Sequence, residues 1–280
     1  MTPDIPLFRS RTLYETAAVS LSHFDHPPGI ALTDAEEQAA ERFQINVVER
    51  GCFRLGYSRS EFTLGPGSVF LSRPGETYIY SHLRHVEPDT CLSLAFSPLF
   101  DDRFGATFQH MPLVPAITNR LNFLILQLRA TASDTLGLDA LACELLDAAV
   151  DADDRRHLYG QQQLRWYAQR IGAARELMDA DPAAQHSLWN LSARVAMSPF
   201  LFARVFRELI GLPPHQYLLR RRLQRAHALL ASGMSVTDTC YEVGFNNLSH
   251  FARSFRRHFG FLPSRLLGGK ATFSERNGKS

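Results

Sequence analysis

The chain has 280 residues, of which 45% are hydrophobic and 21% are charged, with a net charge of +2. This composition is typical of globular proteins and excludes a disordered or coiled-coil chain, and the length suits two domains. No stretch of about 18 uncharged apolar residues occurs, and the first ten residues lack the features of a secretion signal. We therefore expect a cytoplasmic protein, with Cys52, Cys91, Cys143 and Cys240 as reduced thiols.

The charge is distributed unevenly along the chain. Residues 1–160 contain 13 Lys+Arg and 21 Asp+Glu, a net charge of −8, whereas residues 161–280 contain 17 and 7, a net charge of +10. Such a split favours a polyanionic partner for the C-terminal part. A basic surface that only contacts water would give the same net charges, so a sequence motif is needed to decide between this interpretation and a polyanionic partner.

Residues 43–98 have the pattern of short strands broken by turns. The strand candidates are Phe43–Val48, Cys52–Tyr57, Ser68–Leu71, Thr77–Tyr80 and Cys91–Phe96. Gly65–Gly67 and Arg73–Gly75 have the composition of tight turns. Short strands at close, even spacing predict an antiparallel barrel or jelly roll within residues 1–116.

Residues 117–150 change to a helical period. Two sets of apolar residues at this spacing predict two helices joined around Ser133–Gly137. The sets are Leu121, Leu124, Ile125 and Leu128, then Leu138, Leu141, Leu145 and Leu146. The polar stretch 151–160 is predicted to be a linker, and residues 161–280 to form an all-helical domain.

The C-terminal segment contains an internal repeat. Phe202–Arg207 (FARVFR) recurs as Phe251–Arg256 (FARSFR), 49 residues later, and Gly211 and Pro214 recur with the same offset. Upstream the offset is 48, so the second copy has one more residue in its turn. A tandem duplication accounts for this pattern.

The first copy predicts two helices and a tight turn, at about residues 188–210. A short helix over Leu188–Ala196 is followed by a turn at Met197–Ser198. Ser198 is the expected N-cap and Pro199 the first helical residue. The second helix is expected to bury Leu201 or Phe202, Val205 and Phe206, and to end at Gly211.

The second copy predicts the same arrangement at about residues 236–259. Its first helix is Val236–Val243, and Gly244 supplies the positive φ that a sharp turn requires. Asn246 or Asn247 is the expected cap of a helix that ends at Gly260. A tight turn followed by a basic second helix is the geometry that places a recognition helix in a major groove.

A continuous helix is predicted between the two copies. Pro214–Ser232 contains no helix breaker after its first residue, and 19 residues at ~1.5 Å per residue span roughly 28 Å. Successive major grooves on one face lie about 34 Å apart. One chain is therefore expected to place two recognition helices in adjacent grooves.

These features together resemble the AraC (arabinose-regulator) family of bacterial transcription factors. The residues that carry the resemblance are Ala196–Pro199, Phe206–Arg207, Gly211–Tyr217, Arg220–Ala226, Leu229–Leu230, Val243–Phe245, Ser249–Phe251, Phe255–Arg257, Phe259–Gly260 and Pro263–Ser264. The departures are Ala196, where the family usually has glycine, and Ser192 and Cys240 at small-residue positions. More weakly, Gly67–Phe70 followed by Arg73–Glu76 resembles a cupin signature.

The resemblance implies an α+β protein that regulates transcription. It implies a cupin-like, effector-sensing barrel (1–116), a helical dimerisation region (117–150) and an AraC-type DNA-binding domain (161–280). The implied partners are promoter DNA, RNA polymerase, a small-molecule effector and a second copy of the chain. The implied location is the cytoplasm, in association with the nucleoid. By the family pattern the DNA-binding residues are Ser198, Phe200, Leu201, Ala203, Arg204, Arg207, Asn247, Leu248, Ser249, His250, Arg253, Arg256 and Arg257.

Several of these basic and polar residues have a second interpretation. Arginine bonds guanine or holds phosphates, but Arg204 and Arg253 also suit a solvated surface. Ser249 and His250 suit capping and packing. On the connecting helix, Arg220–Arg222 and Arg225 suit phosphate contact, interaction with the helix dipole or pairing within the domain.

The barrel residues predict a small-molecule pocket more readily than a metal site. Tyr57, Tyr78 and Tyr80 are the effector-binding candidates, with ordinary packing as the alternative. Metal-binding cupins use a His-x-His pair and a later His, whereas Tyr57, Arg59 and Tyr78 occupy those places here. His82 and His85 have a spacing that puts them on opposite faces of a strand. We therefore expect no metal and no cofactor.

Catalysis finds no support in the sequence. There is no Gly-x-Ser-x-Gly elbow and no glycine-rich phosphate loop, so a cupin-type enzyme is the weaker alternative and the chain is not expected to be an enzyme. A third alternative is an architectural DNA-binding protein without a ligand, which would bind duplexes by salt-dependent contacts alone.

Overall fold

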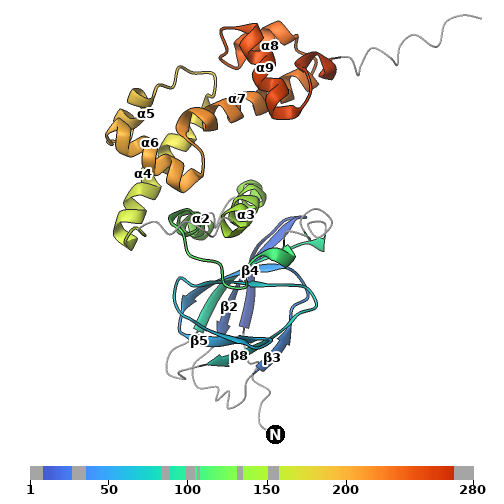
Figure 1. The fold of residues 1–280 in the computed structure, drawn as a ribbon, viewed down its shortest axis with the longest axis vertical. Coiled ribbons are helices and arrows are strands. Elements are labelled where there is room, and N and C mark those ends of the chain that lie inside the picture. The colour runs from blue at the N-terminus through green and yellow to red at the C-terminus, as the bar shows by residue number, and fades with distance from the viewer. Residues whose placement is uncertain are drawn as a thin grey trace, which may run out of the picture. The chain divides into compact units, whose positions relative to one another are not determined.

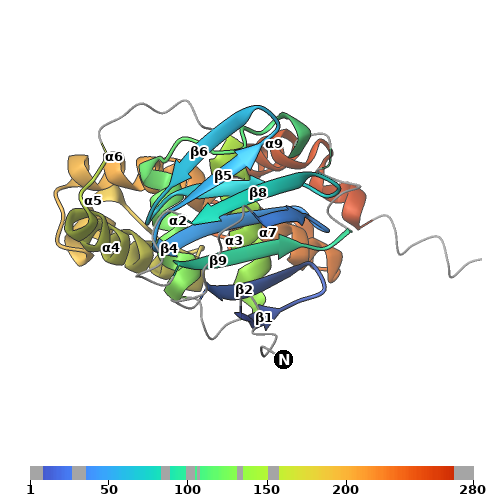
Figure 2. The same cartoon turned by 90° about the horizontal axis from the view of Figure 1, so that it is seen from below.

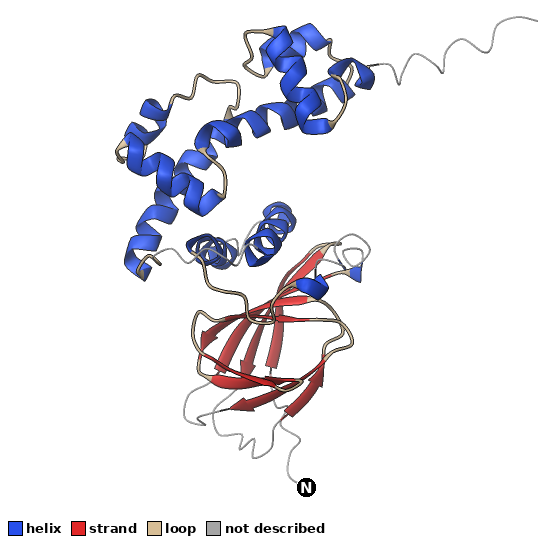
Figure 3. Ribbon diagram, viewed as in Figure 1, coloured by secondary structure: helices blue, strands red, loops and turns tan. Residues whose placement is uncertain are grey.

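The computed structural model describes residues 9–26, 36–82, 89–98, 105, 108–130, 135–150 and 158–267. The chain forms two compact units, residues 1–160 and residues 161–280. The N-terminal unit contains strands and two long helices, and the C-terminal unit is helical (Figure 3). This confirms the predicted α+β class. Within the described residues, no helix combines the length and the apolar character that a membrane crossing requires.

The N-terminal unit is built from two antiparallel sheets (Figures 1 and 2). The first has the order β1 (Arg9–Glu15), β2 (Val19–His26), β9 (Asp89–Phe96), β4 (Gln44–Arg50), β7 (Val69–Ser72). The second has the order β3 (Glu36–Ala39), β8 (Thr77–His82), β5 (Phe53–Tyr57), β6 (Ser60–Leu64). All five predicted strands are present, and β1, β2, β3 and β6 are additional.

Side chains from both sheets meet in one apolar core. Val48, Phe70 and Cys91 come from the first sheet, and Phe53, Leu55, Leu64 and Tyr78 come from the second, with Leu113 added from the following segment. Segment 108–113 also lies against the first sheet: the ring of Phe108 stacks on that of Phe43 at 3.8 Å, and the Leu71 amide donates to the Leu113 carbonyl. The sheets therefore enclose an apolar interior that includes several aromatic side chains.

The helices α2 (Asn119–Ala130) and α3 (Thr135–Val150) follow, as predicted. Polar contacts join them to the barrel: Arg129 Nε lies 3.0 Å from Glu49 Oε1, and Thr16 Oγ1 donates to Asp139 Oδ1 at 2.6 Å. The apolar residues whose spacing predicted these two helices are buried within the single chain: Leu121, Leu124, Ile125, Leu128, Leu138, Leu141, Leu145 and Leu146. They are therefore not a free apolar surface, and pairing of two chains through this region stays a prediction.

The C-terminal unit contains both predicted helix-turn-helix motifs. Its elements are α4 (Gln161–Ala180), α5 (Leu188–Arg194), α6 (Pro199–Ile210), α7 (Pro214–Ala231), α8 (Val236–Glu242), α9 (Leu248–Phe259) and the 3-10 turn η1 (Pro263–Leu266). The first motif is α5–α6 and the second is α8–α9, with α7 as the continuous connecting helix. The linker predicted at 151–160 falls mostly outside the described residues.

The caps explain where α6 and α9, the predicted recognition helices, begin and end. The side chains of Ser198 and Asn247 accept from the amides of Leu201 and His250, which fixes the two N-termini. Gly211 (φ 84°) and Gly260 (φ 82°) end the helices in the left-handed conformation. All four capping residues were predicted, Asn247 as one of two alternatives.

The two turns differ in a way that the sequence did not predict. The first turn lies at Val195–Ala196, and α5 ends at Arg194, two residues before the predicted end. Ala196 has φ 51° and Gly244, at the corresponding point of the second motif, has φ 84°. An alanine therefore holds a left-handed conformation that costs about 1–2 kcal/mol for a residue with a Cβ.

Candidate nucleic-acid interface

The recognition helices α6 and α9 bury the same face of the repeat. Phe202 and Phe206 on α6, and Phe251 and Phe255 on α9, are fully buried. Arg204 and Arg253 each lie two residues after the first of these phenylalanines, roughly 200° around the helix. Both arginines are exposed. Packing of the phenylalanines thus fixes which face of each helix points outward. In both helices this outward face carries the arginine.

The outward stripe of α6 combines one aromatic residue with two arginines. Phe200, Arg204 and Arg207 are all exposed and lie within one face of the helix. Phe200 is 81% exposed, which is unusual for a large apolar side chain. An aromatic ring on a recognition helix suits contact with a thymine methyl group, while the arginines suit guanine or phosphate.

The outward stripe of α9 is more polar and more basic. Ser249, Arg253 and Arg256 correspond to the three α6 residues at the same offset, and all are exposed. Arg257 adds to the positive charge in the last turn, where His258 also lies. Desolvation and the nearby charge of Arg220 lower the pKa of His258, so this imidazole is mainly neutral at pH 7. The arginines therefore carry the charge of this stripe.

None of the thirteen predicted DNA-binding residues is buried, and only Leu201 and Ala203 are partly buried. Ser198 and Asn247 have a structural role as caps. The ring of His250 lies 5.5 Å from that of Phe245, so it also packs within the domain while remaining exposed. Contact of these residues with DNA stays a proposal, and the geometry is compatible with it.

The connecting helix α7 uses its arginines differently. Arg221 Nε lies 2.7 Å from Asp179 Oδ1, Arg222 donates to backbone carbonyls, and Arg225 Nη2 lies 3.5 Å from Glu242 Oε1. Of the roles that the sequence left open, pairing within the domain is therefore the one observed for these three residues. The charge pattern of this helix in the sequence did not indicate which arginines bind other residues of the same domain.

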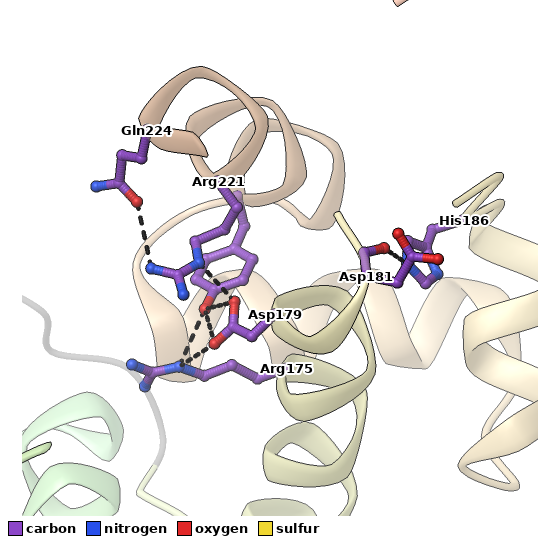
Figure 4. Close-up of polar contacts among 7 residues, drawn as sticks. Arg175, Asp179, Asp181, His186, Arg221 and Gln224 are labelled. Carbon is purple, nitrogen blue, oxygen red and sulfur yellow. Dashed lines mark hydrogen bonds and ion pairs between the residues drawn. The ribbon is translucent and has the colours of Figure 1, made fainter. Parts of the chain in front are cut away.

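Arg221 belongs to a polar cluster that joins α4 to α7 (Figure 4). Tyr217 Oη donates to the Asp179 carboxylate at 2.8 Å and accepts from Arg175 Nε at 3.1 Å. Burial raises the pKa of Tyr217 to about 12, so its hydroxyl stays protonated and remains a donor. The Asp179 carboxylate thus holds the start of α7 against the end of α4.

Replacement of Arg221 by alanine should affect stability and leave the salt dependence of DNA binding unchanged. The pair with Asp179 is half-exposed, so we expect the free energy of unfolding to fall by about 1 kcal/mol or less. Urea unfolding and Kd against salt concentration measure the two effects. Asp179→Asn removes the same ion pair from the other side and also weakens the contacts of Asp179 with Tyr217 and Arg175, so it should destabilise the unit at least as much and leave the salt slope unchanged. A salt slope lowered by about one would instead assign Arg221 to a phosphate.

The tyrosines proposed for effector binding lie together in the barrel. Tyr57 stacks on Tyr78 at 5.3 Å, and Tyr80 lies near the rings of Phe53 and Phe70. Tyr78 is 1% exposed, and its hydroxyl donates to Glu76 Oε2 at 2.8 Å and accepts from the Arg73 amide at 2.9 Å. Tyr78 therefore has a packing role, which leaves Tyr57 and Tyr80 as the accessible candidates.

Arg73 ties this cluster to the segment that leads to α2. Its guanidinium donates to the carbonyl of Phe108 at 2.9 Å and to that of Met111, and pairs with Glu76 at 3.3 Å. A hydrogen bond to Glu76, together with burial, raises the pKa of Tyr57. Tyr57, Arg73, Glu76 and Tyr78 thus form one connected network. The resemblance to a cupin signature included Arg73 and Glu76, but it did not predict that these two side chains form an ion pair.

The metal interpretation gains no support from the described residues. No group of three or more possible His, Cys, Asp or Glu ligands occurs among them. His85 and the side chain of His82, the two histidines weighed from the sequence, lie outside the described part of the chain.

Comparison with known proteins agrees with this geometry. A family described as helix-turn-helix domain matches residues 191–268. The transcriptional activator RhaS of Klebsiella pneumoniae (strain 342) is 26% identical over 239 residues, which are 81% of this chain and 85% of the relative. RhaS of Shigella dysenteriae is 24% identical over 258 residues, 88% and 92% of the two chains. These alignments extend well beyond the helix-turn-helix region, and both relatives are transcriptional activators.

Two solved structures each match about a third of the chain. A probable AraC family transcriptional regulator from Rhodopseudomonas palustris is 31% identical, with a TM-score of 0.34, over 36% of this chain and 95% of that one. The cupin domain of Schizosaccharomyces pombe Cnp3 is 13% identical, with a TM-score of 0.30, over 36% of this chain and 73% of that one.

Proposed function

We propose that this chain, which carries an AraC-type DNA-binding domain and is a regulator of transcription, is a ligand-responsive activator that reads two adjacent major grooves of a promoter. The observation that carries the proposal is the repeated geometry of α6 and α9. Each helix has a tight turn before it, a phenylalanine core on one face and an arginine, Arg204 or Arg253, on the other. This is the arrangement of a recognition helix.

The distance between the two helices suits a single DNA turn. The connecting helix α7 has 18 residues and is therefore roughly 27 Å long. Adjacent major grooves on one face of B-DNA lie about 34 Å apart, and the side chains of α6 and α9 reach outward from its ends. One chain would therefore contact two sub-sites about 10 base pairs apart.

The N-terminal unit is proposed to receive the signal. Its net charge of −8 argues against contact with DNA. Its interior holds Tyr80 beside Phe53 and Phe70, and Tyr57 in the network of Arg73 and Glu76, so it offers apolar and polar groups together, as small-molecule sites do. An effector that favours one conformation would shift the population able to contact promoter and RNA polymerase. If two chains pair, the outward faces of α2 and α3 are the surfaces left for it.

An isolated fragment of residues 161–280 should fold and bind duplex DNA. The fragment is a compact unit with its own core and a net charge of +10. If it neutralises roughly 6–10 phosphates, its affinity should fall about 10³- to 10⁵-fold between about 50 and 200 mM salt, because bound counterions are released. Circular dichroism and fluorescence anisotropy with a labelled duplex measure these properties.

The outcome separates the alternatives. A fragment that is unfolded, or that shows no affinity at low salt, would contradict the assignment of this unit. Affinity that depends on salt but not on DNA sequence would instead support an architectural DNA-binding protein. Selection of duplexes from a random library with the same fragment measures whether its affinity depends on DNA sequence.

A further inference from the structure

Arg222 lies in the middle of α7 and binds two segments that are far apart in the sequence. Its Nε donates to the Pro182 carbonyl at 2.7 Å, and its Nη2 donates to the Ala184 carbonyl at 2.9 Å and to that of Ala183 at 3.4 Å. Its Nη1 donates to the Gly244 carbonyl at 3.0 Å. The guanidinium thus uses its fork of donors on backbone alone.

These two segments are the approaches to the two helix-turn-helix motifs. Residues 182–184 lie in the loop between α4 and α5, immediately before the first motif, whereas Gly244 is in the turn between α8 and α9. We name the Arg222 guanidinium and the carbonyls of Pro182, Ala183, Ala184 and Gly244 the Arg222 clamp. It connects the first motif to the second independently of the covalent path along α7.

The two backbones also touch directly at the clamp. A Cβ placed on Gly244 would lie 2.5 Å from the Ala183 carbonyl oxygen and 2.9 Å from the Ala183 Cα. Only glycine permits so close an approach. The corresponding residue of the first turn, Ala196, is exposed, so this contact has no counterpart in the other copy of the repeat. The duplication therefore does not explain the clamp.

The loop that the clamp holds is itself braced. Asp181 Oδ1 accepts from the amides of Ala183 and Ala184 at 3.1 and 3.2 Å, and the His186 ring lies 2.7 Å from the Asp181 carbonyl. Figure 4 shows Asp181 and His186 together at this bend. The next residue, Ser187, caps α5. A displacement of the loop is therefore transmitted to the first motif.

From these contacts we infer that the Arg222 clamp fixes the orientation of the two recognition helices and so sets the spacing of the two DNA sub-sites that the chain accepts. The inference rests on the proposed function. A single helix bends gently along its length, and α7 alone leaves freedom of bending and twist between its ends. The clamp adds a second connection across the same junction, which limits that freedom. Arg222 acts in this scheme as a positioning residue that touches no DNA.

The test uses full-length protein and a duplex that the wild type selects from a random library. The same duplex is then made with one base pair inserted or deleted between the two sub-sites. Each change rotates one sub-site by about 35° and moves it by about 3.4 Å. For the wild type we expect the loss of affinity to be roughly 30-fold or more, because one motif loses its base contacts. Arg222→Gln should reduce this loss to about threefold.

Two further variants make the result specific. Asp181→Ala unbraces the loop without changing α7 and should give an intermediate spacing penalty, which keeps the test informative if Arg222→Gln does not fold. Arg220→Gln, an exposed arginine on the same helix, is the matched control and should keep the wild-type penalty.

General weakening of binding lowers the affinity for all duplexes by one factor and leaves the spacing ratio unchanged. A wild-type ratio in both folded variants would overturn the inference and leave the proposed function intact. A wild-type protein that selects no duplex would overturn the proposed function and, with it, the inference.

Discussion

Gly244→Ala is expected to lower the free energy of unfolding of the C-terminal unit by about 2–4 kcal/mol. The left-handed conformation, at φ 84°, costs alanine about 1–2 kcal/mol. The new Cβ would also overlap the Ala183 carbonyl, 2.5 Å away, and such overpacking costs about 1–3 kcal/mol. Reduced freedom of the unfolded chain returns about 0.4–1 kcal/mol. Urea unfolding of residues 161–280, followed by circular dichroism, measures the change.

The matched control lies at the corresponding point of the first turn. Ala196 has a positive φ but is exposed, so Ala196→Gly relieves backbone strain and removes no packing. We expect a change within about 1 kcal/mol, towards greater stability, because strain relief and unfolded-state entropy oppose each other. Equal and small effects of the two substitutions would show that the approach of Gly244 to Ala183 does not constrain the domain.

The elements that the sequence predicted are those whose local pattern agrees with their final environment. Strands such as β4 and β9 are rich in β-branched and apolar residues, and α6 and α9 have both caps and a repeated apolar face. The strand β3, with the sequence EEQA, was missed because its conformation comes from pairing with β8 and not from its own residues. Pairing partners at a distance leave no local signal.

The candidate interface shows the same division. The outward positions of Arg204 and Arg253 follow from helical geometry and the buried phenylalanines, so the sequence predicted them. Arg221 forms an ion pair with Asp179, and Arg222 donates hydrogen bonds to backbone carbonyls. Both interactions depend on how α7 packs against α4 and the loop that follows α4. Likewise, no pattern in the barrel distinguished the fully buried Tyr78 from the partly buried Tyr57. These contacts are tertiary, and periodicity does not encode them.

Arg204→Ala and Arg253→Ala should each lower affinity for the preferred duplex by about 1–3 kcal/mol and flatten the preference at one defined base pair. The reason is their equivalent position on the outward faces of α6 and α9, opposite the buried Phe202 and Phe251. Because α7 places the helices near one DNA turn, the two affected base pairs should lie about 10 apart. Binding of each variant to a library of single-base variants of the preferred duplex measures both effects.

Two controls distinguish a loss of base recognition from a loss of folding. Helix content by circular dichroism must match the wild type, and Arg221→Ala, whose side chain is paired with Asp179, should leave the base preference unchanged. An unaltered profile at lower affinity would mean that Arg204 and Arg253 hold the DNA backbone, because phosphate contacts weaken all sequences about equally. Base reading would then fall to the other exposed residues at the start of the recognition helices, namely Phe200, Asn247, Ser249 and His250.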